Sequence, residues 1–434
     1  KTLTSPIPPE FLKTLTDERG VSNTELEALS LVLTGKSTQD EIAHFLGITP
    51  IALRKRLGEV YRKFEITGTG PGKLVELKQR LIRAYQTHQT QSSRRRDWGE
   101  APDVSVMYGR QEEQERLKQW IVQDNSRLVA ILGMAGIGKT TLAVNLAQDI
   151  EEEFEFIIWR SLRNPLPLDT LLADWLIALG NQEESDLPTD LNERLSLLRD
   201  YLSQHRCLFI LDDVETIVRS GDRFGRYSPD YEEYGLLVRQ LGESSHQSCL
   251  LLCSQETLRD IRRLETTRPS VHSLQLNPLP DAAARQILAE NGLTGEEKWD
   301  SLIRDYQGNP LALKLVAATI QEYFNGDVVE FTNLQTILVD DIFRENLDRQ
   351  FEKLSNLERE IIQSLASQDK PLSLRTLQKN NSISFSELLE VLDSLRGRSL
   401  IEKTGGDRKK TSEPFFTLQP IIRKYVKTYK LNDL

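Results

Sequence analysis

The chain has 434 residues, which is too long for a single hydrophobic core, so we expect several domains. Three cysteines, no zinc-ligand spacing, no secretory leader and no membrane-spanning apolar run predict a cytoplasmic, reduced protein without a membrane segment. The net charge of −10 is uneven, because residues 1–96 carry 16 Lys and Arg against 10 Asp and Glu. The remainder is therefore at −16, and the basic front of the chain predicts an anionic partner there.

A run of helices is expected over residues 22–85. A capping box at Thr38 opens one helix, a glycine turn follows, and Thr49 caps the next helix, whose first residue is Pro50. This helix–turn–helix pattern leaves basic side chains outside, where nucleic acid would be contacted. The four candidates for DNA binding are Arg54, Lys55, Arg62 and Lys63.

Residues 24–43, the following Leu-Gly-Ile-Thr turn and residues 60–64 resemble the LuxR-type DNA-binding domain. The resemblance implies a helix-turn-helix domain over residues 1–85 that binds double-stranded DNA. The first two candidates would meet bases or phosphates, and the last two the backbone. Ile51 and Ala52 depart from the family, which usually has small polar residues there. The alternative is a helical module that docks protein and whose charges are only solvated.

A polar segment follows the basic module. Residues 86–104 are rich in glutamine, serine and arginine and have no apolar periodicity, which predicts a linker.

A phosphate-binding loop is predicted next. Leu128–Leu132 reads as a strand and residues 141–150 as a helix, and the G-x-x-x-x-G-K-T pattern lies between them as the motif requires. Backbone N–H groups and the helix N-terminus would hold phosphate, Lys139 would reach the β and γ phosphates, and Thr140 would bind Mg²⁺. The alternative is a plain glycine-rich turn. The residues expected around the phosphates are Gly133, Met134, Ala135, Gly136, Ile137, Gly138, Lys139, Thr140 and Thr141.

Three further apolar runs, at 154–159, 207–211 and 248–253, alternate with helical segments. This alternation predicts a parallel sheet covered on both faces, in an α/β phosphate-loop NTPase fold. The second run ends in two carboxylates. We expect Asp212 to hold Mg²⁺ and Asp213, the catalytic candidate, to orient or deprotonate the attacking water.

Several motifs, taken together in order, resemble the NB-ARC class of STAND ATPases, which are signalling switches. They lie at residues 106–113, 156–162, 274–279 and 308–313. The resemblance implies an adenine nucleotide, ADP or ATP, as ligand. It implies that Tyr108, Arg110 and Pro310 close around the adenine side. It also implies a phosphate-facing switch region near Arg160.

The same resemblance implies the domains that follow. A nucleotide-binding α/β domain is expected over residues 105–275 and a helical subdomain over 276–345. Residues 346–434 read as helices followed by a hairpin, which predicts a winged-helix domain. In the family this domain locks ADP in place; the alternative is a DNA-binding role.

Two positions depart from the family. Gln255 replaces an arginine that senses the γ-phosphate, and Gln419 replaces a histidine on the ADP β-phosphate. A neutral amide forms a weaker bond to phosphate than a cation does, so discrimination between ADP and ATP should weaken. Arg160 is the expected substitute. Hydrolysis should be slow, because no arginine finger is identifiable.

The sequence therefore predicts a slow ATPase used as a switch. Its most direct output would be DNA binding by a transcription regulator that forms homo-oligomers when activated. One alternative is a signalling or defence scaffold whose N-terminal module binds protein, and another is a phosphate-loop enzyme with metabolic turnover.

Overall fold

The computed structural model describes residues 7, 9–34, 38–66, 72–94, 96–104, 106–180, 184–368, 370–404 and 414–430. The chain divides into two compact units, Lys1–Arg94 and Arg95–Leu434, and each is considered by itself. Within the described residues, every helix is too short or too polar to cross a bilayer.

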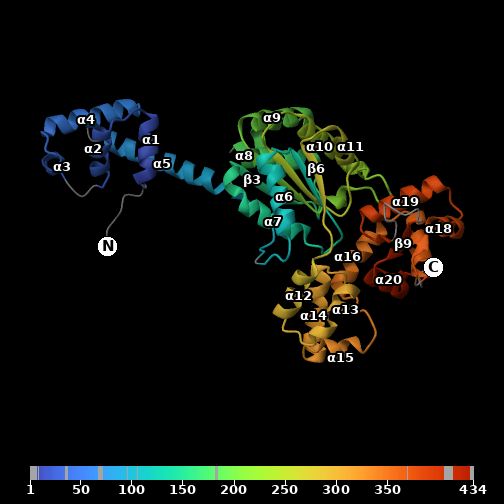
Figure 1. Cartoon of the computed structure of the whole chain (residues 1–434). Helices are drawn as coiled ribbons and strands as arrows, with labels where there is room; N and C mark the ends of the chain where they lie inside the picture. The colour runs from blue at the N-terminus through green and yellow to red at the C-terminus, as the bar shows by residue number, and fades with distance from the viewer. Residues whose placement is uncertain are drawn as a thin grey trace. The chain divides into compact units, whose positions relative to one another are not determined.

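All regular structure in the described residues of the N-terminal unit is helical, as predicted (Figure 1). Its helices are α1 (Pro9–Glu18), α2 (Asn23–Thr34), α3 (Gln39–Phe45), α4 (Pro50–Lys63) and α5 (Gly72–Arg94). The predicted capping box at Thr38 and the N-cap at Thr49 are both confirmed. On α4, Leu53, Leu57 and Val60 are buried and form the inner face of that helix.

The first part of the predicted linker, residues 86–94, is helical. Helix α5 continues to Arg94, because its sequence is rich in Lys, Arg, Gln and Leu and has no proline or internal glycine. Arg96–Asp97 then form β1, which pairs in parallel with β3 and begins the second unit. Lack of an apolar stripe therefore did not mean lack of regular structure.

The second unit begins with an α/β domain built on one sheet (Figure 1). The sheet strands after β1 are β2 (Leu128–Leu132), β3 (Phe156–Ser161), β4 (Cys207–Asp212), β5 (Cys249–Ser254) and β6 (Val271–Gln275). They lie in the order β1-β3-β4-β5-β2-β6, and every pairing is parallel, which confirms the predicted sheet type. Strand β6 was not anticipated, because only two of its five residues, Val271 and Leu274, are buried.

Helices cover both faces of this sheet, as predicted. They are α6 (Gln111–Lys118), η1 (Gln119–Gln123), α7 (Lys139–Asp149), η2 (Glu151–Glu153), α8 (Leu168–Gly180), η3 (Glu184–Asp186), α9 (Leu191–Gln204), η4 (Val214–Ile217), η5 (Pro229–Tyr231), α10 (Tyr234–Glu243) and α11 (Arg259–Thr267). Alternate residues of β2 enter two separate apolar clusters: Leu128 and Ala130 pack with α8 to α11, and Val129 and Ile131 pack with α6 and α7. This alternation is the period of two of a strand buried on both sides.

Helices follow the sheet. They are α12 (Asp281–Glu290), η6 (Glu296–Lys298), α13 (Trp299–Asp305), α14 (Pro310–Phe324) and α15 (Val328–Thr332). The last part, which we call the C-terminal body, contains α16 (Asp341–Glu352), α17 (Asn356–Ala366), β7 (Leu372–Ser373), α18 (Leu374–Asn381), α19 (Phe385–Gly397), β8 (Ile401–Thr404), β9 (Phe415–Leu418), α20 (Pro420–Tyr425) and η7 (Val426–Lys430). The predicted hairpin is confirmed, because β8 and β9 pair antiparallel and β7 adds to β9. The turn between β8 and β9 lies outside the described residues.

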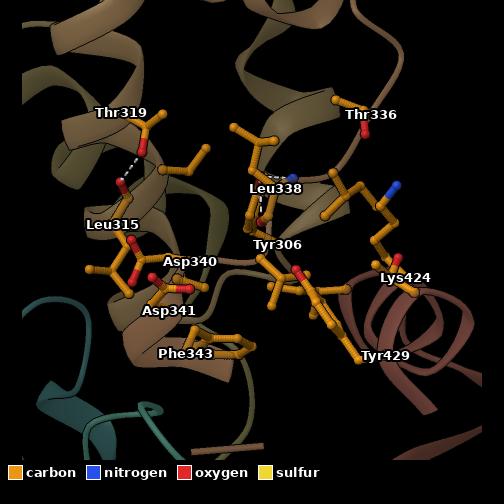
Figure 2. Close-up of a pocket in the computed structure, with 16 residues that line it drawn as sticks. Tyr306, Leu315, Thr319, Thr336, Leu338, Asp340, Asp341, Phe343, Lys424 and Tyr429 are labelled. Carbon is orange, nitrogen blue, oxygen red and sulfur yellow. Dashed lines mark hydrogen bonds between the residues drawn. The ribbon is translucent and has the colours of Figure 1, made fainter. Parts of the chain in front are cut away.

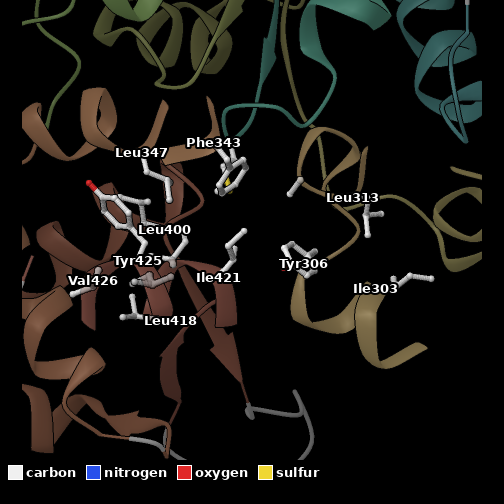
Figure 3. Packing of buried hydrophobic residues seen from close by; sticks show 14 of the residues in the cluster. Ile303, Tyr306, Leu313, Phe343, Leu347, Leu400, Leu418, Ile421, Tyr425 and Val426 are labelled. Carbon is white, nitrogen blue, oxygen red and sulfur yellow. The ribbon is translucent and has the colours of Figure 1, made fainter. Parts of the chain in front are cut away.

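One apolar core joins these helices to the C-terminal body (Figure 3). Ile303, Tyr306 and Leu313 belong to the same buried cluster as Leu418 and Ile421. The cluster also contains Met134 from the predicted phosphate loop. The loop is thus packed directly on the part of the chain that follows the sheet.

Candidate functional site

The predicted phosphate loop lies at the carboxyl end of β2, between β5 and β6. Gly138 precedes α7 with φ 101°, a left-handed conformation that favours glycine. Gly133 donates its N–H to the Ser254 carbonyl at 3.2 Å, which ties the loop to β5. Met134, Ala135 and Ile137 are buried. A buried strand, a glycine turn and the N-terminus of α7 thus meet as the motif predicts.

The side chains of Lys139 and Thr140 turn toward the loop and toward β4. The Lys139 ammonium donates to the carbonyls of Gly133 and Met134 at 2.9 and 3.2 Å and is only 9% exposed. The Thr140 hydroxyl donates to Asp212 Oδ2 at 2.8 Å. Thr141 is half-buried at the start of α7. The fold therefore brings together the lysine, the hydroxyl and the carboxylate that the motifs single out.

The two carboxylates after β4 have different surroundings. Burial, followed by the neighbouring Asp213 charge, raises the pKa of Asp212 to about 6. Asp213 has φ 56° and accepts a hydrogen bond from the Ser161 hydroxyl at 3.1 Å. The Arg163 Nε lies 3.6 Å from its carboxylate. Asp212 is thus buried and Asp213 is partly exposed, so the two carboxylates are suited to different roles.

Helix α14 begins against the phosphate loop. Asn309 caps α14 and donates its side-chain amide to the Ala135 carbonyl at 3.0 Å. Pro310 is the first helical residue, and Leu311 donates its N–H to the Gly136 carbonyl at 3.3 Å. The start of α14, including Pro310, therefore forms one wall of the loop.

Arg110 is tied to the loop from another side. It is 3% exposed and donates to the Ile137 carbonyl at 3.2 Å and the Asn277 carbonyl at 2.7 Å. Tyr108 donates its hydroxyl to Glu290, and the Lys314 ammonium lies 5.2 Å from its ring centre. Arg110 therefore supports the loop backbone, and Tyr108 lies against the helices after the sheet.

Arg160, the expected substitute phosphate contact, is bonded to two carboxylates in this structure, and its contact with phosphate stays a prediction. Its guanidinium donates to Asp174 at 2.6 Å and to Asp97 at 2.7 Å. Asp97 belongs to the edge strand β1, and none of the interactions found among the described residues links Arg160 to the phosphate loop. The strand was not expected from the sequence, so its carboxylate partner was not expected either.

The two glutamines at the departing positions lie in different surroundings. The Gln255 amide donates to Glu215 Oε1 at 2.6 Å. Gln419 is 8% exposed and lines a cavity of about 660 Å³ that Met134 and Ile137 of the loop also line. Three cations that the sequence analysis did not consider line it as well: Arg262, Arg396 and Lys403.

A second cavity has a volume of about 390 Å³ (Figure 2). Its lining comes from α14, the segment before α16 and the last helical turns, and includes Tyr306, Leu338, Lys424 and Tyr429. The Tyr306 hydroxyl bonds the backbone of Leu338 in both directions, at 3.0 and 3.1 Å. This cavity shares no residue with the phosphate loop.

The four DNA-binding candidates of the N-terminal unit differ in their exposure and in their ion pairs. Arg54 and Lys55 are exposed. Arg62 forms an exposed ion pair with Glu59 at 2.8 Å. Lys63, expected on the outer face, is instead half-buried and donates to Glu25 at 2.6 Å and to the Gly20 carbonyl at 2.8 Å. The loop after α1 and the start of α2 were not considered as its partners.

Exposed apolar side chains flank the turn between α3 and α4. Phe45 at the end of α3 is 76% exposed, and so is Ile51 at the start of α4. The helix ends at Phe45, so the ring leaves the packed face one turn beyond Ile42, which is buried.

Comparison with known proteins supports the predicted family resemblance of the central segment. Residues 110–228 match the family model of the NB-ARC domain. An uncharacterized WD repeat-containing protein of Nostoc sp. is 43% identical over 353 residues, which are 78% of this chain and 27% of that protein. Disease resistance RPP13-like protein 4 of Arabidopsis thaliana is 30% identical over 117 residues, which are 26% of this chain and 13% of that protein. The chain thus spans about a quarter of the first relative and less of the second.

A solved structure shares the fold. The Walker-type ATPase of Pyrococcus abyssi has a TM-score of 0.51 and 13% sequence identity, over 74% of this chain and 96% of that one. The predicted resemblance to NB-ARC domains is therefore confirmed for residues 110–228, together with the parallel-sheet phosphate-loop fold. The resemblance of the N-terminal unit to LuxR-type domains stays a prediction.

Proposed function

We propose that this chain is an ADP- and ATP-dependent switch of the STAND class. One observation carries the proposal: Lys139, Thr140 and Asp212 converge on a glycine loop at the N-terminus of α7. That loop is bonded in turn to the start of α14. A ligand held there would contact both the α/β domain and the helices after it. Binding of such a ligand would therefore affect the conformation of the rest of the unit.

Magnesium fits the same site. The Thr140 hydroxyl and the Asp212 carboxylate are oxygen ligands of the kind that Mg²⁺ prefers. The ion would supply positive charge that stabilises phosphate oxygens and would keep Asp212 ionised. Asp213, at the rim, would orient or deprotonate water. With Gln255 bonded to Glu215 and Arg160 bonded to two carboxylates, hydrolysis should be slow.

The helical and C-terminal parts that follow the sheet would hold bound ADP in place. We assign residues 105–275 to the nucleotide-binding domain, 276–345 to the helical subdomain and 346–434 to a winged-helix domain. The antiparallel strands β7, β9 and β8 beside α17 to α19 support the last assignment. Gln419 lines the same cavity as Met134 and Ile137, which supports its role near the phosphates.

Bound nucleotide is the first test. Purified protein, washed without added ligand and then denatured, should release ADP in about equal amount to protein. The reason is that a nucleotide enclosed between packed domains dissociates slowly. Chromatography of the supernatant measures it. A wild-type protein that is empty, and whose thermal unfolding ignores added ADP and ATP, would contradict the switch.

For the output we infer DNA binding by the N-terminal unit, in a transcription regulator that oligomerises when activated. The basic front of the chain and the exposed Arg54 and Lys55 on α4 support this inference. A single small module binds DNA weakly, and association of several copies would raise the effective concentration. The second candidate, a signalling or defence scaffold that binds protein, is favoured by the exposed Phe45 and Ile51 at the same turn.

Salt dependence separates these outputs. The regulator should bind duplex DNA with affinity that falls steeply as salt rises. Arg54→Ala/Lys55→Ala should weaken binding about tenfold or more and lower the salt slope, because each lost phosphate contact removes about one unit of slope. Fluorescence anisotropy at several salt concentrations measures both.

The charge-matched control is Lys13→Ala/Lys78→Ala, which removes two cations from α1 and α5. Equal losses in both variants would indicate only bulk charge. Absent or salt-insensitive binding by the wild type would favour the scaffold. Steady-state ATP hydrolysis above about one per second would instead favour a metabolic enzyme.

A further inference from the structure

A buried guanidinium joins the C-terminal body to the α/β domain. Arg398, which follows α19, is 3% exposed. It donates to Glu256 Oε1 at 2.8 Å and to the Asp222 carbonyl at 2.9 Å, and both partners belong to the α/β domain. Glu256 follows β5 and is itself 6% exposed. The contact is therefore a dry ion pair between two parts of the chain that are 142 residues apart.

A second cation crosses the same boundary. The Lys353 ammonium, after α16, donates to the Glu215 carbonyl of η4. In return Gly221 donates its N–H to the Lys353 carbonyl at 2.9 Å, and the Ser220 hydroxyl donates to the Glu352 carbonyl at 3.0 Å. The C-terminal body is thus bonded to two different loops at the carboxyl ends of β4 and β5.

A fully buried carboxylate completes the cluster on the side of the C-terminal body. Glu358 accepts hydrogen bonds from the backbone and hydroxyl of Ser355 and from the Ser394 hydroxyl, each at 2.7 Å. Its Oε1 lies 3.7 Å from Arg398 Nε. These bonds fix the carboxylate that orients the guanidinium toward Glu256.

The cluster continues to the candidate nucleotide site. Glu215 lies three residues after Asp212, and its carboxylate receives the Gln255 side-chain amide at 2.6 Å and the Gln255 backbone N–H at 3.2 Å. The Glu215 charge contributes to the raised pKa of Asp212. The position that departs from the family, Gln255, is therefore held by the same carboxylate that stands beside the C-terminal body.

We propose that Glu215, Gln255, Glu256, Lys353, Glu358 and Arg398 form an interdomain latch that holds the C-terminal body on the α/β domain by protein contacts alone. A dry ion pair is strongly weakened by loss of one partner, since the other charge is left buried. Separation of the two bodies would instead let water reach Glu256 and Arg398. The latch therefore favours either full closure or full separation. It would supply the closure that weakened phosphate contacts at Gln255 and Gln419 no longer supply, and in this respect it rests on the proposed switch.

The charge balance of the latch gives it a pH dependence. Three carboxylates (Glu215, Glu256, Glu358) face two cations (Lys353, Arg398), so full ionisation would leave one uncompensated negative charge. Burial raises the pKa of Glu256 to about 7, although Arg398 and Lys353 act in the opposite direction. At pH 7 the closed latch therefore holds a proton on Glu256 in about half of the chains, and above pH 7 Glu256 is mostly ionised and paired with Arg398.

The direction of the pH effect follows by linkage. Glu256 has a higher pKa in the closed form than in a hydrated, separated form, so the closed form binds the proton more tightly. Between about 4.5 and 7, acidification therefore favours closure. From pH 8 to pH 6 the ratio of closed to open chains should rise about tenfold. Glu256→Gln should remove most of this change.

The test measures the distance between the two bodies in the full chain. All three native thiols are buried, so cysteines placed at the exposed Arg263 of α11 and Lys379 of α18 would carry the spin labels. Pulsed dipolar spectroscopy on protein from which bound nucleotide has been removed should give one short-distance population for the wild type. Arg398→Met should raise the open-to-closed ratio on the order of a hundredfold and give a long-distance population.

Two further variants keep the test decisive. Glu256→Leu removes the partner on the α/β side and should open the chain as Arg398→Met does. Arg349→Met breaks an exposed ion pair with Glu345 on α16 and should leave the distances unchanged. Circular dichroism verifies folding. Folded Arg398→Met and Glu256→Leu that both keep the wild-type distances, or opening by Arg349→Met, would overturn the latch.

Binding of a fluorescent ADP analogue, measured on the same samples, separates the two proposals. If Arg398→Met opens the chain but the protein binds no nucleotide, the proposed nucleotide switch is contradicted and the latch is supported. Nucleotide binding without opening would overturn the latch alone.

Discussion

Lys139→Ala is expected to lower the affinity for ADP by about a hundredfold or more. A hydrogen bond to a charged group contributes about 1.5–3 kcal/mol, and this ammonium would make such bonds to phosphate oxygens. In the ligand-free chain the same ammonium bonds the carbonyls of Gly133 and Met134. Its loss leaves them without that donor, so the melting temperature should also fall slightly. Titration calorimetry and thermal unfolding measure the two effects.

The matched control for this variant is Lys118→Ala. Lys118 lies in the same domain and pairs with Asp149 of α7 at the surface, where both side chains are more than a third exposed. Exposed pairs contribute little to stability, so ADP affinity should stay within about twofold of wild type. Unchanged ADP affinity in Lys139→Ala would show that the phosphate loop does not bind the nucleotide.

Gly136→Ala is expected to destabilise the second unit by about 3 kcal/mol and to weaken ADP binding more than about tenfold. A Cβ at this position would lie 2.7 Å from Leu311 Cβ and 3.0 Å from Asn309 Oδ1. Overpacking costs about 1–3 kcal/mol, and a positive φ of 75° adds about 1 kcal/mol for a residue with a side chain. The start of α14 would have to move away from the loop. Chemical denaturation and calorimetry measure the outcome.

Gly221→Ala separates the two causes. Gly221 has φ 74°, but a Cβ there would meet nothing within 4 Å. It should show only the smaller backbone cost and normal ADP affinity. Equal effects in the two variants would mean that the contact between the loop and α14 has no part in binding.

Local patterns anticipated much of the nucleotide site. The apolar run of β2, the glycine spacing and the helical run of α7 follow from neighbouring residues, so their arrangement could be read directly. The meeting of Thr140 with Asp212, 72 residues away, followed from the rule that parallel strands end at one edge of the sheet.

Contacts between distant segments could not be read in this way. Arg160 looked available because its partner Asp97 lies in a two-residue strand that no periodicity reveals. Arg398 and Lys353 could not be singled out from the sequence, because their burial depends on how the C-terminal body packs on the loops after β4 and β5. Lys63 was misjudged for the same reason, since its partner Glu25 lies on another helix.

The edge strand β1 has a mechanical consequence. Its two residues are hydrogen-bonded along β3 and are held by ion pairs of Arg96 with Glu151 and of Asp97 with Arg160. A force applied along the axis of this strand would load these parallel bonds together, in shear, before any of them could unzip. The strand therefore resists being peeled from the edge of the sheet one bond at a time.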